Sequence, residues 1–200
     1  PASRWTAEQR KVFESAAGVL RAGADKLVPL ARDTPHRVMR ELYSQLIAYD
    51  RAYADTIPNY APVDDELALT RNSLTLAIND ICDSVANFSA ANRAPGIAPA
   101  APPTASAPVN DPADAGRFVT VSIPTCSQFN AQLDRTVSKL DAWYRINADI
   151  PASQRSSADT VLWNMAGEVL GRSADEWEQI GRASGNPVIE DFLVLGAQYY

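Results

Sequence analysis

The chain has 200 residues, of which 46% are hydrophobic and 21% are charged, a composition typical of folded globular proteins. Its net charge of -6 and pI near 4.8 disfavour a nucleic-acid partner, because a phosphate-binding surface needs clustered Lys and Arg. No apolar run reaches the ~20 residues that span a bilayer. Since the chain opens with Pro1 instead of Met, we expect any export signal or anchor to lie upstream of it.

Two amphipathic helices are predicted first, from apolar residues at three- and four-residue steps. The first begins at Thr6, which forms the capping-box pattern with Gln9, and Pro29 is expected to kink or end it. The second is expected to start with Thr34 as N-cap and Pro35 at the first helical position. The residues expected on the buried face of the first helix are Phe13, Ala16, Ala17, Leu20, Ala24, Leu27 and Ala31.

A third helix is predicted behind the acidic residues 64–66 and runs through Phe88. Residues 91–116 are rich in Pro and Ala and predict a semi-rigid linker. Residues 118–123 alternate weakly like a strand but have no evident partner, so we expect extended coil there. A fourth helix follows Cys126.

The end of the sequence resembles its beginning when it is shifted by 150 positions without a gap. Residues 151–153 repeat residues 1–3, and helical core positions then coincide, as in Val19 with Val169. Fixed-period self-similarity marks repeated structural units. The sequence therefore predicts an all-α helical bundle built from an internal duplication and interrupted by a Pro/Ala-rich linker.

The predicted division is a first helical unit at 1–90, a linker and extended segment at 91–124, and a second helical unit at 125–200. Residues 1–90 lack a helix that precedes the repeated pair, and residues 125–200 lack the one that follows it. Within the second unit, Gly171 can end a helix, and Ser173 with Glu176 can cap another, so a break is expected there.

Cys82 and Cys126 form an even pair at the two borders of the low-complexity segment. A disulfide between them would close a long loop and stabilise the fold by about 4 kcal/mol, and it would indicate an oxidising compartment. The alternative is two unrelated buried thiols, because free Cys is often a small core residue.

Residues with catalytic chemistry are scarce. His36 is the only histidine, so the chain cannot build a multi-histidine metal site by itself, and we expect His36 to be solvated near the start of the second helix. Gly-rich phosphate loops are absent, and the paired acids lie at predicted helix starts, where they stabilise the helix dipole. We therefore expect a protein without enzymatic activity, cofactor or metal.

Aromatic residues are the most informative set. Their apolar bodies and polar edges suit the lining of a ligand groove between helices, but helix packing predicts the same spacing. The groove candidates are Tyr43, Tyr49, Tyr53, Trp143, Trp163 and Trp177.

The linker composition, the predominance of Arg over Lys and two sequence runs carry a resemblance. The runs are Thr34–Tyr43 and Ala52–Pro58. With these features the chain resembles actinobacterial, and more narrowly mycobacterial, membrane-anchored or secreted proteins of unknown function. The resemblance implies a cell-envelope location and brings no catalytic residue with it.

Two functions are compatible with these features. The first is a non-catalytic, extracytoplasmic interaction or scaffold module of the cell envelope, secreted or tethered upstream of residue 1, that presents helical faces to a protein partner. The second is a ligand-binding or sensor domain that holds a lipid-like or small apolar molecule between its helices. A filled core with an exposed apolar patch favours the first, and a cavity of several hundred Å³ favours the second.

Overall fold

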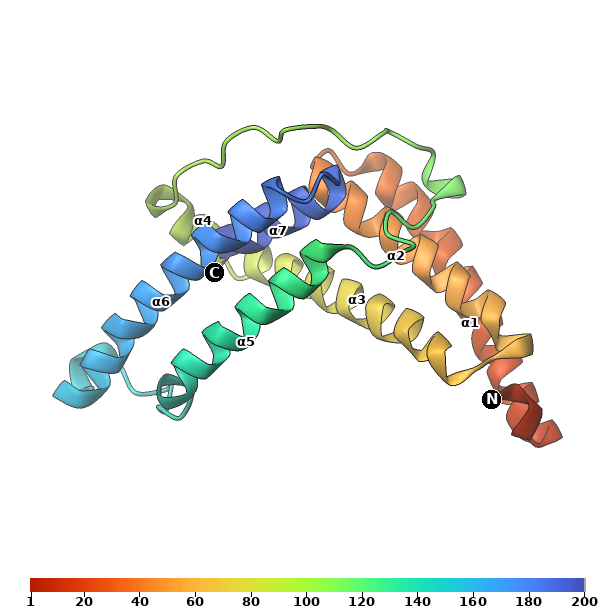
Figure 1. Cartoon of the computed structure of the whole chain (residues 1–200), viewed down its shortest axis with the longest axis horizontal. Coiled ribbons are helices and arrows are strands. Elements are labelled where there is room, and N and C mark those ends of the chain that lie inside the picture. The colour runs from red at the N-terminus through yellow and green to blue at the C-terminus, as the bar shows by residue number, and fades with distance from the viewer. Residues whose placement is uncertain (200) are drawn as a thin grey trace. The chain divides into compact units, whose positions relative to one another are not determined.

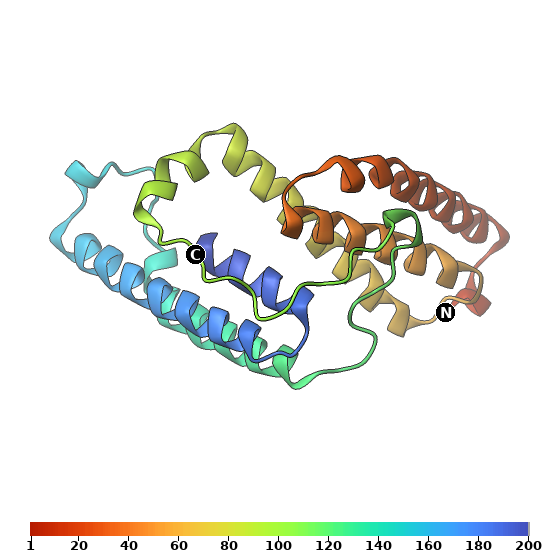
Figure 2. The same cartoon turned by 90° about the horizontal axis from the view of Figure 1, so that it is seen from above.

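The computed structural model describes residues 1–199 (Figures 1 and 2). Within them the chain is helical and contains no strand, which confirms the predicted all-α class. It divides into two compact units, Pro1–Ala98 with Pro108–Thr120, and Pro99–Ala107 with Val121–Tyr200. The α-helices are α1 (Ala7–Asp33), α2 (Arg37–Thr56), α3 (Asp65–Ala86), α4 (Ser89–Arg93), α5 (Pro124–Tyr144), α6 (Ser157–Arg182) and α7 (Pro187–Tyr199).

In the first unit, α2 lies between α1 and α3 and packs against both (Figure 2). The contact between α1 and α2 is close because small residues line it. Ala24 and Ala31 are fully buried beside Ile47, and Ala17 is buried beside Ala54. Small side chains let two helix backbones approach, so the rest of the unit is arranged around this pair.

In the second unit, α6 is the central helix and packs against both α5 and α7. Leu140 of α5 is fully buried with Ala166 and Val169 of α6. On the side of α7, a Cβ atom added at Gly181 would lie 3.0 Å from Leu193 Cβ. Two faces of α6 are therefore packed against neighbouring helices, one against α5 and the other against α7.

Elements of the two units begin 150 residues apart. The capping box predicted at Thr6 is present, with the Thr6 hydroxyl accepting from the Gln9 N–H, and Ser156 makes the corresponding box. Trp5 stacks on Phe13 with ring centroids 4.2 Å apart. At the equivalent place the guanidinium of Arg155 lies 4.0 Å from the ring centroid of Trp163. The local architecture repeats at the predicted offset, and its origin by duplication stays a prediction.

The part of the Pro/Ala-rich segment that belongs to the first unit is held by polar side chains of α1 and α2. Arg32 pairs with Asp111 at 2.7 Å. The Gln45 amide donates to the Gly116 carbonyl at 2.9 Å, and the Arg51 guanidinium donates to the Ala113 carbonyl at 2.5 Å. The pKa of Asp111 is lowered because the Ala113 N–H and then Arg32 donate to its carboxylate. Asp111 is therefore ionised at neutral pH and can pair with Arg32.

The part that belongs to the second unit is held by α6 and α7. Arg182 donates to the carbonyls of Ala101 and Pro102 at 3.0 and 3.1 Å. Both the backbone N–H and the hydroxyl of Thr104 donate to Glu190, which also pairs with Arg182. The predicted linker is thus attached at defined points within each unit.

One expectation for the first half was wrong. α1 ends at Asp33, one turn after Pro29, with Ala31 packed in the core and the Thr34 N–H donating to Leu30. Thr34 therefore follows the end of α1 instead of capping α2. The N-cap of α2 is His36, whose Nδ1 accepts from the Met39 N–H at 3.4 Å.

The break predicted in the second half is absent, because α6 is continuous from Ser157 to Arg182. Ser173 does not cap a helix: its hydroxyl donates to the Val169 carbonyl within α6 and lies 2.7 Å from Thr136 Oγ1 of α5. The buried contact between Ser173 of α6 and Thr136 of α5 keeps α6 helical through the Gly171 region. None of the helices in the described residues is long and apolar enough to span a membrane.

The disulfide predicted between Cys82 and Cys126 is not formed. Both residues are free and exposed, one on α3 of the first unit and the other on α5 of the second. Cys82 continues the four-residue spacing of Leu74 and Ile78 on α3 but is exposed near the end of that helix. The cysteines therefore give no indication of the compartment.

Two of the three glycines of α6, Gly171 and Gly181, predict opposite effects of the same substitution. Gly171→Ala should raise the free energy of unfolding by about 0.8–1 kcal/mol, because Ala is the better helix former and nothing lies within 4 Å of the added Cβ. Gly181→Ala should lower it, because the added Cβ meets Leu193 Cβ at 3.0 Å and the Glu190 carbonyl oxygen at 3.3 Å. Urea unfolding of both variants measures the difference, and stabilisation by Gly181→Ala would contradict the close packing of α6 on α7.

Candidate functional site

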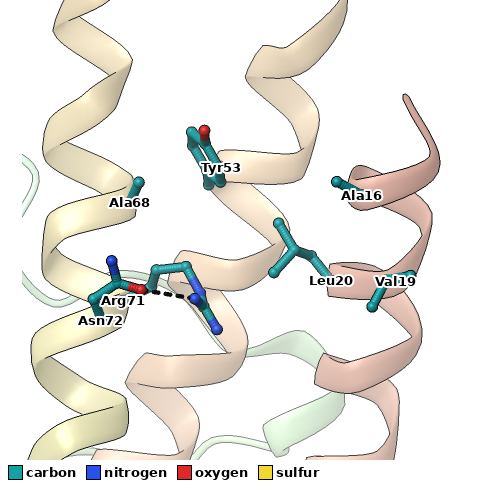
Figure 3. Close-up of a pocket in the computed structure, with 7 residues that line it drawn as sticks. All are labelled: Ala16, Val19, Leu20, Tyr53, Ala68, Arg71 and Asn72. Carbon is teal, nitrogen blue, oxygen red and sulfur yellow. Dashed lines mark hydrogen bonds between the residues drawn. The ribbon is translucent and has the colours of Figure 1, made fainter. Parts of the chain in front are cut away.

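The candidate site is a groove in the first unit, between α1 and α3 and over α2 (Figure 3). Its cavity volume is about 470 Å³. Residues of α1 and α3 form the two walls, and Tyr53 of α2 lies between them. The lining residues are Ala16, Val19, Leu20, Tyr53, Ala68, Arg71 and Asn72.

The α1 wall continues beyond the cavity as a stripe of residues at three- and four-residue steps. This spacing places all of its members on one face of the helix. Val12, Val19 and Leu30 are 66%, 69% and 52% exposed. We call this set the open stripe, and it consists of Val12, Ala16, Val19, Gly23, Lys26 and Leu30.

The equivalent stripe of α6 is covered. Val169, which lies 150 positions after Val19, is only 5% exposed, and Ala166, the equivalent of Ala16, is 1% exposed. The helix that covers them is α5, whose Leu140 packs against both. The face of α6 at Ala166 and Val169 is therefore buried by α5, whereas the face of α1 at the positions 150 residues earlier is open.

Arg71, the charged residue of the groove, is already paired with an acidic side chain. The Arg71 Nε donates to Asp50 Oδ1 at 2.5 Å, and its Nη1 donates to Asn72 at 2.8 Å (Figure 3). The Asp50 side chain is only 6% exposed. Burial, followed by Asp65 and Asp64, raises the pKa of Tyr53, which keeps its hydroxyl protonated at neutral pH. The groove thus offers aliphatic surface with hydrogen-bonding groups at its base.

The tyrosines predicted to line a ligand groove have different surroundings. Tyr53 lines the cavity. Tyr43 packs instead against the core cluster of α1 and α2, and the Tyr49 ring faces the Arg117 guanidinium at 5.9 Å. The structure places one of the three in the groove.

The tryptophans lie in the helix seams of the second unit. Trp143 and Trp163 meet edge to face with ring centroids 5.1 Å apart, and Trp177 contacts Phe129 at 5.0 Å. These contacts join α5 to α6. The structure therefore brings Trp143 and Trp163 together, and it places all three residues in a different unit from Tyr53.

The single histidine has a structural position. His36 caps α2, and Asn186, 150 residues later, caps α7 by accepting from the N–H groups of Val188 and Ile189. Among residues 1–199, no three His, Cys, Asp or Glu side chains come together as a metal ion would require.

Sequence reasoning missed the open stripe because it assigned α1 a single apolar face. Ala16 was expected to be buried and is exposed. The signal was present, since Val12, Val19 and Lys26 recur every seven residues and lie to one side of the buried set at Ala17 and Ala24. The hydrophobic pattern alone could not tell which of two adjacent stripes has a partner.

The comparisons with known proteins cover the whole chain. A family model described as "Mycobacterial ESX-1 associated protein" matches residues 1–200. An uncharacterized protein of Mycolicibacterium smegmatis (strain MKD8) is 38% identical over 195 residues, which is 98% of this chain. The chain spans about half of that relative, 52% of its length. No solved structure matches.

The buried pair at the base of the groove predicts a large effect on stability. Arg71→Ala should lower the free energy of unfolding by about 3–5 kcal/mol, because it leaves the buried Asp50 carboxylate without its ionic partner. Asp55→Ala is the control: it removes the exposed pair with Arg21 and should change stability by about 1 kcal/mol or less. Chemical denaturation measures both, and equal effects would show that the Asp50–Arg71 pair does not hold α3 on α2.

Proposed function

Because the chain belongs to the family of mycobacterial ESX-1 associated proteins, we propose that it is a non-catalytic helical interaction module that works with the ESX-1 secretion system. It binds a protein partner through the groove between α1 and α3. The observation that carries the proposal is the open stripe of α1, whose equivalent on α6 is buried by another helix.

The length of the open stripe favours a protein partner. From Val12 to Leu30 it spans 18 residue steps, or about 27 Å of helix at 1.5 Å per step. A small molecule in the cavity would leave most of this surface exposed. A partner helix would reach all of it and could cover the exposed side chains of Val12, Val19 and Leu30 together.

The second candidate is a ligand-binding or sensor domain. The cavity of about 470 Å³ is within the range of small-molecule sites, and Tyr53 supplies a hydroxyl for a ligand that is otherwise apolar. This candidate predicts a bound small molecule in protein isolated from its host, which the interaction module does not require.

The proposal places the module outside the cytoplasm, either secreted or tethered to the membrane by a segment outside residues 1–200. Its support is the association of the family with a secretion system. Cell fractionation of the tagged protein, with and without a protease that cannot cross the membrane, tests this location.

Val19→Glu should abolish partner binding without unfolding the chain. Val19 is 69% exposed, so the substitution should change stability by about 0.5 kcal/mol or less, but it puts a charge in the middle of the apolar stripe. Val161→Glu is the matched control, because Val161 is 65% exposed on α6 and lies outside the groove. The measurement is the amount of ESX-1 components that co-purify with each tagged variant from a mycobacterial host.

We expect Val19→Glu to lose these components and Val161→Glu to keep them. Equal recovery with both variants would contradict the groove as the binding surface. A small molecule that is displaced by Val19→Glu, observed by native mass spectrometry, would replace the interaction module with the ligand-binding candidate.

A further inference from the structure

The seam between α5 and α6 shows how a helix packs on the open stripe's counterpart. The two helices run antiparallel, since Phe129 contacts Trp177 near one end and Trp143 contacts Trp163 near the other. Leu140 packs between them against Val169. The seam thus advances in three- and four-residue steps along both helices, which is the pattern of an amphipathic helix pair.

The seam has a polar position with a counterpart in α1. The hydroxyls of Thr136 and Ser173 lie 2.7 Å apart and are buried. The residue 150 positions before Ser173 is Gly23, and nothing lies within 4 Å of a Cβ atom built there. A helix on α1 finds no side-chain hydroxyl at this place, so we expect an aliphatic residue where α5 has Thr136, whose hydroxyl otherwise donates only to the Gln132 carbonyl of its own helix.

The seam also has a charged position with a counterpart in α1. Arg135 of α5 pairs with Glu176 of α6 at 3.7 Å. The residue equivalent to Glu176 is Lys26, which is exposed on the open stripe. A helix with α5's own sequence would bring Arg135 toward a like charge, whereas an acidic residue in its place would be attracted.

We propose that the open stripe is the docking site for one amphipathic α-helix of a partner protein, packed antiparallel to α1 as α5 packs on α6. That helix has an aliphatic residue opposite Gly23 and an acidic residue opposite Lys26. This inference rests on the proposed function and defines the chemistry of the partner. The charge at Lys26 disfavours α5 of a second copy as the occupant.

Two labelled peptides of residues 122–146 test this assignment against the full chain by fluorescence anisotropy. The first carries Thr136→Leu and keeps Arg135. The second carries Thr136→Leu together with Arg135→Glu. Because exposed charge pairs contribute modestly, we expect the second peptide to bind roughly threefold more tightly than the first.

Variants of the full chain identify the surface and the charge contact. Lys26→Glu should reverse the preference between the two peptides, and Val19→Glu should abolish binding of both. Val161→Glu should leave both affinities unchanged. A preference that survives Lys26→Glu, or binding that survives Val19→Glu, would overturn the proposal.

Two further outcomes also overturn it and separate it from the proposed function. Sedimentation of the full chain as a dimer that Val19→Glu dissociates would assign the stripe to a second copy. Absence of binding by either peptide would reject this helix seam, while recovery of ESX-1 components that depends on Val19 would still support the interaction module.

Discussion

The close approach of α1 to α2 is the contact on which the first unit depends. Ala17, Ala24 and Ala31 recur every seven residues on α1 and are 0–3% exposed, so they form a narrow, smooth face against α2. In the second unit the equivalent positions are Gly167, Ala174 and Gly181, of which Gly181 is packed against Leu193 and Glu190 of α7. Because this face of α1 is covered by α2, a further neighbour of α1 must use the next face around the helix.

That next face distinguishes the two units. On α6 it is buried by α5 through Leu140, Thr136 and Phe129. On α1 the side chains of Val12, Val19 and Leu30 on this face are exposed to solvent. Covering the exposed valine and leucine side chains of α1 would be favourable, because removing apolar surface from water contributes about 25 cal/mol per Å². Binding of a partner helix is the physical consequence that we propose.

Much of the fold could be predicted from the sequence where local signals act alone. The capping box at Thr6 and the helical spacing behind it are confirmed. One prediction failed where a tertiary contact overrides a local signal, because the Gly171 region is held helical by the buried contact between Ser173 and Thr136. The anchors of the Pro/Ala-rich segment were also invisible, since Arg32 and Arg182 reach partners about 80 residues away in sequence. The groove escaped prediction because exposure depends on which neighbour is present.

Thiol reactivity can test whether the face of α1 at Val19 is open while the face of α6 at Val169 is covered. In a Cys82→Ser and Cys126→Ser background, Val19→Cys and Val169→Cys place one thiol at each equivalent position. We expect the thiol at position 19 to react with a disulfide reagent at nearly the rate of a free thiol. The thiol at position 169 should react at least about a hundredfold more slowly, since it becomes accessible only when α5 opens locally from α6. Equal protection of both thiols would contradict the open stripe and with it the proposed docking site.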